Sequence, residues 1–139
     1  MSEKTSPEQD LSLLKSHDTI YPSSPEDAKL EVFENTHPNR DYLITFDCPE
    51  FTSICPITGQ PDFGHITIEY IADQLCVESK SLKLYLFSFR NHGAFHEAVT
   101  NQILDDFVNV CQPRRATVKG IFRPRGGIAI HVTADYEAP

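Results

Sequence analysis

Residues 95–111 read FHEAVTNQILDDFVNVC, with an apolar side chain at every fourth position. The series consists of Phe95, Val99, Ile103, Phe107 and Cys111. In a helix of about 3.6 residues per turn these side chains share one face, which Leu104 and Val108 widen. The stretch therefore predicts a long amphipathic helix with one face buried.

Strands are predicted on both sides of this helix. After it, residues 117–122 and 128–133 are rich in β-branched and aromatic side chains, and Pro124-Arg125-Gly126-Gly127 between them is typical of a hairpin turn. Before it, residues 42–46 and 65–71 have the same composition, and the second stretch alternates apolar and polar side chains. We expect four strands.

The apolar run at residues 80–90 is compatible with a strand or a helix. A helix is favoured by a capping serine, Ser79 or Ser81, and by the stop signal at residues 91–93. The element order is then strand, strand, helix, helix, strand, strand. It predicts an α+β domain, an antiparallel four-stranded sheet with both helices on one face. The two open sheet edges favour assembly of subunits edge to edge into a barrel.

Charge separates the chain into two parts. The 139 residues carry a net charge of -8, of which residues 1–36, with eight acids and three bases, contribute -5. This leading part contains several prolines and serines and has no sustained periodicity. We interpret residues 1–35 as an extended or disordered arm and residues 36–139 as a single domain.

Several classes of protein are excluded by composition. No apolar run approaches the roughly 18 residues of a membrane span, and the N-terminus lacks the pattern of a signal peptide. The four cysteines contain no CxxC pair, so we expect reduced thiols. These features predict a soluble, cytoplasmic protein that does not contact a membrane.

The segment Pro49–Gly64 contains three prolines and two glycines and is predicted to be a long irregular loop. It holds Cys55, followed by a proline, and Asp62 seven residues later. A thiolate and a carboxyl group at this spacing could act as nucleophile and general acid. The alternative is a buried cysteine in a turn, while Cys48, Cys76 and Cys111 are interpreted as core or strand residues.

Other charged residues have two interpretations each. The strip at residues 113–127 has five basic and no acidic side chains, and could bind phosphate or be a solvated strand face. Glu97 could complement the helix dipole or accept hydrogen bonds from a guanine-like edge.

His92 and His96 have the i, i+4 spacing of zinc ligands. Gly93 interrupts the turn between them, however, and no third ligand has a suitable spacing, so no metal is expected.

Residues 78–85, ESKSLKLY, match a distinctive octapeptide. Together with Cys55, Asp62 and the pair His96 and Glu97, they resemble the QueF family of NADPH-dependent nitrile reductases, in its short single-domain type. These enzymes convert 7-cyano-7-deazaguanine (preQ0) to 7-aminomethyl-7-deazaguanine (preQ1) in the biosynthesis of queuosine, a modified tRNA base. The resemblance extends over about residues 35–136. It implies the tunnelling fold and an assembly of two facing pentameric rings with sites between subunits.

The resemblance also implies roles for individual residues. Cys55 would add to the nitrile to form a covalent thioimidate, Asp62 would donate the proton, and His96 would shield and polarise the reacting centre. Glu97 would bind the deazaguanine edge. The base pocket would be lined by Val77, Glu78 and Ser79.

For the cofactor NADPH, no glycine-rich GxGxxG motif follows a strand, so phosphates must meet side-chain cations. The candidates are Lys80, Lys83, Arg123 and Arg125. Two other functions stay open. One is a zinc-dependent hydrolase like GTP cyclohydrolase I, although that branch's ligand pattern is missing at the Cys55 loop. The other is a non-catalytic tRNA-binding module, which the net charge of -8 disfavours, so no direct contact with nucleic acid is expected.

Overall fold

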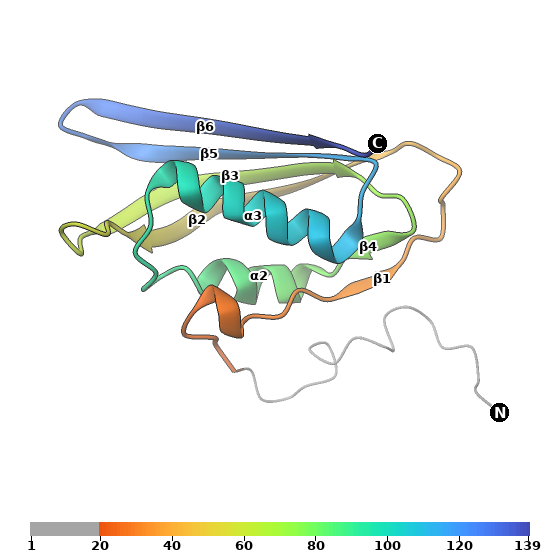
Figure 1. Cartoon of the computed structure of the whole chain (residues 1–139), viewed down its shortest axis with the longest axis horizontal. Coiled ribbons are helices and arrows are strands. Elements are labelled where there is room, and N and C mark those ends of the chain that lie inside the picture. Colours follow the sequence, from red (N-terminus) through yellow and green to blue (C-terminus); the bar gives the residue numbers. More distant parts are fainter. Residues whose placement is uncertain (1–19) are drawn as a thin grey trace.

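A computed structural model of the chain describes residues 20–139. One antiparallel sheet has the strand order β2-β3-β5-β6. Its strands are β2 (Leu43–Ile54), β3 (Pro61–Ile71), β5 (Arg115–Arg125) and β6 (Ile128–Glu137). Helices α2 (Ser79–Phe87) and α3 (His96–Cys111) both cover the same face of this sheet (Figure 1). The predicted α+β architecture, with its four-stranded sheet and two helices, is confirmed.

A second, two-stranded sheet was not predicted. It pairs β1 (Val32–Glu34) with β4 (Leu75–Val77), and a 3₁₀ turn at Pro25–Asp27 precedes it. Part of the predicted arm thus packs on the domain, because residues 20–35 contribute a strand. The arm's remaining residues, 1–19, lie outside the described part of the chain.

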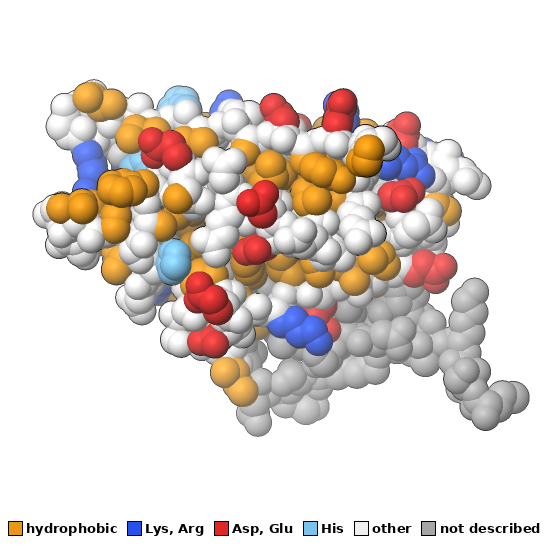
Figure 2. Space-filling model, viewed as in Figure 1, with side chains coloured by type: hydrophobic (Ala, Val, Ile, Leu, Met, Phe, Trp, Pro, Cys, Tyr) orange, Lys and Arg blue, Asp and Glu red, His pale blue; other side chains and the backbone are white. Residues whose placement is uncertain are grey.

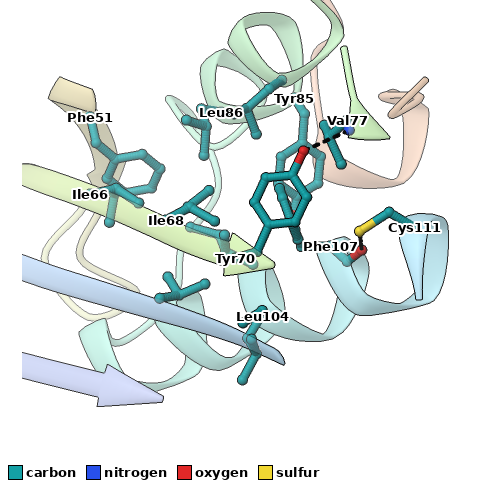
Figure 3. Packing of buried hydrophobic residues seen from close by; sticks show 14 of the residues in the cluster. Phe51, Ile66, Ile68, Tyr70, Val77, Tyr85, Leu86, Leu104, Phe107 and Cys111 are labelled. Carbon is teal, nitrogen blue, oxygen red and sulfur yellow. Dashed lines mark hydrogen bonds between the residues drawn. The ribbon is translucent and has the colours of Figure 1, made fainter. Parts of the chain in front are cut away.

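The core lies between the large sheet and the two helices (Figure 3). Ile66, Ile68 and Tyr70 alternate along β3 and are at most 1% exposed. The Tyr70 ring packs edge-on against Phe107 of α3, with 4.8 Å between centroids. Burial of each such side chain contributes about 1.5–3 kcal/mol. The predicted apolar face of α3 is confirmed from Val99 to Cys111, whereas Phe95 precedes the helix and is exposed.

The prediction of an irregular loop over residues 49–64 is wrong. Strand β2 continues to Ile54 and β3 begins at Pro61, so only residues 55–60 form the connection. Pro49 lies where the β2–β3 register shifts, between Cys48 and Phe51. A bulge on an edge strand tolerates a residue without an N–H group, and Pro61 stands at the first position of its strand.

The predicted helix at residues 80–90 is confirmed, but its capping residue is neither Ser79 nor Ser81. The Glu78 carboxylate accepts hydrogen bonds from the backbone N–H groups of Lys80 (2.6 Å) and Ser81 (2.7 Å). The Ser81 hydroxyl instead accepts from the N–H of Glu31. The predicted hairpin at residues 124–127 is also confirmed, with Gly126 and Gly127 at positive φ.

Candidate active site

Cys55 lies in the short turn that joins β2 to β3. Its N–H donates to the carbonyl of Gln60 (2.8 Å), and its own carbonyl accepts from the N–H of Gly59 (2.9 Å). Gly59 has φ of +72°, a conformation that glycine adopts without strain. The turn therefore holds the backbone of Cys55 by hydrogen bonds on both sides.

The Cys55 thiol is partly exposed, and not buried as the alternative interpretation has it. Hydrogen bonds from the Thr58 side chain and from the backbone of Thr58 and Ile57, with a contribution from Arg125, lower its pKa to about 7. Burial has the opposite effect on Cys48 and Cys111, raising the pKa of these thiols to about 11 and about 12. Of these three thiols, only Cys55 has a large thiolate fraction near neutral pH.

Asp62, the second residue of β3, lies at the centre of a polar cluster in which Asp62 and His96 are buried and Arg125 is exposed. Its Oδ1 is 2.9 Å from Nε of Arg125, and its Oδ2 is 3.3 Å from Nε2 of His96. Asp62 is 6% exposed and His96 9% exposed. Three elements meet here, because Asp62 comes from β3, His96 from the start of α3 and Arg125 from the end of β5.

The Phe122 ring of β5 packs against the His96 side of this cluster. Its ring is stacked on the imidazole of His96, with 3.9 Å between centroids. A Cβ atom at Gly64 or Gly120 would lie 2.9 Å or 2.8 Å from the Phe122 ring, so both glycines are needed for its position. Sequence reasoning missed Phe122, although its alternation with Val118 and Ala116 places it on the helix-covered face.

Glu97 follows His96 in the first turn of α3, and it is exposed. Large apolar side chains are also exposed at this end of the molecule. They include Ile57 (78%), Phe95 (58%) and Ile128 (68%). Figure 2 shows hydrophobic side chains gathered at its left end, over the turns of both hairpins. The cluster around Asp62 therefore borders an exposed apolar surface.

Val77, Glu78 and Ser79 lie at the other end of the domain. The N–H of Val77 donates to the Tyr70 hydroxyl (3.0 Å; Figure 3). Tyr70 is eight residues after Asp62 on β3, which places it about 26 Å along the strand at about 3.3 Å per residue. This distance is much greater than the width of a two-ring base. Within one chain, Val77 is therefore too far from Asp62 for both to contact the same base.

Comparison with known proteins identifies the family. Residues 61–139 match the family described as QueF-like protein. NADPH-dependent 7-cyano-7-deazaguanine reductases from Bacillus mycoides (strain KBAB4) and Bacillus cereus (strain AH187) are each 55% identical to the chain over 131 residues. In each case the match covers 94% of this chain and 79% of the relative. The chain belongs to the QueF family.

A solved structure supports the same fold. The archaeosine synthase QueF-Like, in its apo form, superposes with a TM-score of 0.65 and is 21% identical in sequence. The match covers 70% of this chain and 95% of that chain. The tunnelling fold predicted for this QueF-family chain is therefore confirmed.

The four cations predicted to bind NADPH have different surroundings in this QueF-family chain. Lys83 lies on α2 beside a hollow of about 360 Å³ between α2 and β2, which Arg90 also lines. The backbone of Lys80 takes part in the α2 cap. The guanidinium of Arg123 lies 5.3 Å from the Phe63 ring centroid. Arg125 instead contacts Asp62, so it belongs to the cluster around the predicted general acid.

His92 and His96, which have the spacing of zinc ligands, face different partners. The His92 ring packs edge-on against Phe89, at 5.6 Å, whereas His96 lies between Asp62 and Phe122. Within residues 20–139, no three His, Cys, Asp or Glu side chains are grouped so that they could hold a metal ion. In the same residues, no helix is long and apolar enough to cross a membrane.

Proposed function

We propose that this QueF-family chain reduces the nitrile of preQ0 to the primary amine preQ1, with two NADPH per nitrile, in queuosine biosynthesis. The observation that carries the proposal is the β2–β3 hairpin. Its turn holds the Cys55 thiol, with a pKa of about 7, and the second residue of its second strand is Asp62, buried against His96 and Arg125. The named relatives support the substrate and the cofactor.

The chemistry follows from the two groups. The Cys55 thiolate attacks the nitrile carbon and forms a C–S bond, while one C–N π bond breaks. The developing negative charge on nitrogen takes the proton of Asp62, which gives a neutral thioimidate and leaves a carboxylate between two cationic or N–H donor groups, Arg125 and His96. That carboxylate is stabilised where it forms.

Two NADPH molecules, bound one after the other, would each supply one hydride of the four-electron reduction. Between the two hydrides the thiol must leave from carbon, and a thiol with a lowered pKa is a good leaving group. The resulting imine has to stay in the site and away from water until the second reduction. His96, stacked on Phe122, would form one wall of the site, and Glu97 would bind the N–H edge of the base.

Lys80, Lys83, Arg123 and Arg125 would hold the phosphates of NADPH, because cationic side chains match its diphosphate and 2′-phosphate. The exposure of Lys83 beside a hollow that Arg90 also lines supports this role. Arg125 contacts Asp62, which supports a position for it next to the reacting nitrile.

A complete site therefore lies between subunits in our proposal. Val77, Glu78 and Ser79 of one copy would face Cys55, Asp62 and Glu97 of another. Three observations support this: the long separation within one chain, the edge strands β2 and β6, which pair with no further strand of this sheet in residues 20–139, and the exposed Ile57, Phe95 and Ile128 beside the cluster. We propose two facing pentameric rings, working in the cytoplasm.

The test is incubation of the purified protein with preQ0 and NADPH. We expect two NADPH consumed per nitrile and a product whose mass has increased by four hydrogens. Size-exclusion chromatography with light scattering should give the mass of ten chains. NADPH consumption without loss of preQ0, or no consumption at all, would contradict the proposed reaction.

A further inference from the structure

Ser53 has an unusual hydroxyl group. It is 0% exposed, and its Oγ is the one buried side-chain oxygen or nitrogen in residues 20–139 without a hydrogen-bond partner. Buried hydroxyl groups are nearly always paired, because burial without a partner costs the hydration that the group had in the unfolded chain. An alanine would avoid this cost, so the serine needs an explanation.

The position of Ser53 in the sheet supplies an explanation. Ser53 of β2 is the direct cross-strand partner of Asp62 of β3. Partners of this kind point to the same face of a sheet, with Cβ atoms about 4.5–5.5 Å apart. Both side chains are buried, Asp62 at 6% exposure. In our proposal, a rotation about the Cα–Cβ bond of Ser53 turns its hydroxyl toward the carboxyl group.

The groups that already contact Asp62 do not suit both of its protonation states. Arg125 can only donate hydrogen bonds, and Nε2 of His96 accepts one only in a single neutral tautomer. A protonated carboxyl needs an acceptor for its O–H, and a carboxylate needs donors. A serine hydroxyl provides one donor and two acceptor lone pairs, so it can serve both states.

We propose that Ser53 is a positioning residue for Asp62. Its hydroxyl accepts the O–H of the protonated acid before the reaction, and it donates to the carboxylate after the proton has moved to the nitrile nitrogen. The proton itself passes from Asp62 Oδ to the substrate nitrogen, and Ser53 exchanges one hydrogen bond for another without net transfer. This role rests on the proposed function, because it assigns Ser53 to the proton-donating step.

The proposal separates the effect on rate from the effect on stability. Because the Ser53 hydroxyl has no partner in the structure, Ser53→Ala should lower the melting temperature less than a serine variant that loses an existing hydrogen bond. Thioimidate formation should slow by about tenfold, the effect of one hydrogen bond on a rate. Binding of preQ0 should change less than about twofold in a Cys55→Ala background, because Ser53 is fully buried and does not touch the base.

Ser88 provides a matched control. It is also buried, at 1% exposure, but its hydroxyl is paired with the backbone carbonyl of Tyr85. Ser88→Ala should lower the melting temperature and leave the rate of thioimidate formation unchanged. Ser53→Thr, which keeps the hydroxyl, should react faster than Ser53→Ala, and its melting temperature shows whether the added methyl group is accommodated.

The experiment mixes each variant with preQ0 without NADPH and follows the covalent adduct by intact-protein mass spectrometry, beside thermal unfolding. A slow but stable Ser53→Ala supports the proposal. It is overturned if Ser53→Ala reacts at the wild-type rate, or if its loss of rate comes with a loss of stability like that of Ser88→Ala. If wild type forms no adduct, the proposed function fails as well.

Discussion

The ring of Phe122 lies parallel to the imidazole of His96, with 2° between the two ring planes. This arrangement depends on the space that Gly64 and Gly120 leave on the sheet, because a side chain at either position would meet the Phe122 ring. The orientation of His96 is therefore determined partly by two glycines that the sequence analysis did not include among the site residues.

Gly120→Ala should damage the site and the fold together. The new Cβ would lie 2.8 Å from Cε2 of Phe122 and 2.8 Å from Oγ1 of Thr100, both in the core. Overpacking of this kind costs about 1–3 kcal/mol, and displacement of Phe122 should slow reduction in the molecules that stay folded. Urea unfolding and NADPH consumption would measure the two effects. Gly93→Ala is the control, since its nearest contact would be 3.4 Å, and it should be milder in both assays.

Alkylation of Cys55 should depend on pH with a midpoint near its pKa of about 7. The thiolate is the reactive form, so the rate with iodoacetamide rises as pH increases through this value and is low below about pH 6. Thr58→Val removes the hydroxyl that contributes most to the lowered pKa and should move the midpoint upward. A midpoint that stays in place in this variant would show that Thr58 does not stabilise the thiolate.

Replacement of single cysteines should identify the nucleophile. Cys55→Ala should abolish reduction and the covalent adduct, whereas Cys48→Ala, Cys76→Ala and Cys111→Ser should keep the chemistry in the fraction that folds. Burial raises the pKa of the Cys48 and Cys111 thiols, which makes them poor nucleophiles at neutral pH. Intact-protein mass spectrometry with preQ0 would detect one added substrate mass. An adduct that survives in Cys55→Ala would assign the bond to another residue.

Asp62→Asn and Glu97→Gln should fail at different steps. Asparagine cannot donate the proton, so thioimidate formation should slow by about 10²- to 10⁴-fold while binding of preQ0 stays nearly intact. Glutamine at position 97 would set an N–H group against the substrate's own N–H and should weaken binding by about 1–3 kcal/mol. Titration of preQ0 by calorimetry in a Cys55→Ala background separates the two. Weaker binding by Asp62→Asn than by Glu97→Gln would reverse the assignment.

The predicted cofactor cations should fall into two groups. Lys80→Ala combined with Lys83→Ala should raise the KM for NADPH and reduce the preference for NADPH over NADH, without changing adduct formation in the absence of cofactor. Arg125→Ala should slow adduct formation even without NADPH, because Arg125 contacts Asp62 at 2.9 Å. Steady-state kinetics with both cofactors and adduct formation without cofactor decide this. Equal behaviour of the two variants in the adduct assay would contradict the division.

The large elements of the fold could be predicted because their periodicity is local. Val99, Ile103 and Phe107 lie on one face of α3 wherever the helix packs, and the alternation in β3 likewise needs no knowledge of its neighbours. The prolines prevented prediction of the hairpin whose turn is residues 55–60. Its composition resembles a loop, and only the bulge and the strand start show why Pro49 and Pro61 are tolerated.

The surroundings of the predicted nucleophile and acid could not be read from the chain in this way. Strand register sets Ser53 opposite Asp62, and ring stacking joins Phe122 to His96 across a long stretch of sequence. Glu78 was predicted as part of a base pocket, and the structure places its carboxylate on the first N–H groups of α2. The same residue type at the same position serves either purpose, and only coordinates show the capping contact.

The turn from Cys55 to Gln60 restricts the motion of the Cys55 backbone. Because Cys55 is tied by its own N–H and carbonyl to Gln60 and Gly59, between two long paired strands, its conformational entropy is lost when the chain folds and not when a ligand arrives. The nucleophile would then need no ordering step before it reacts. Its amide proton should exchange with solvent slowly, as slowly as amides inside β2, although the residue lies in the turn and outside both strands.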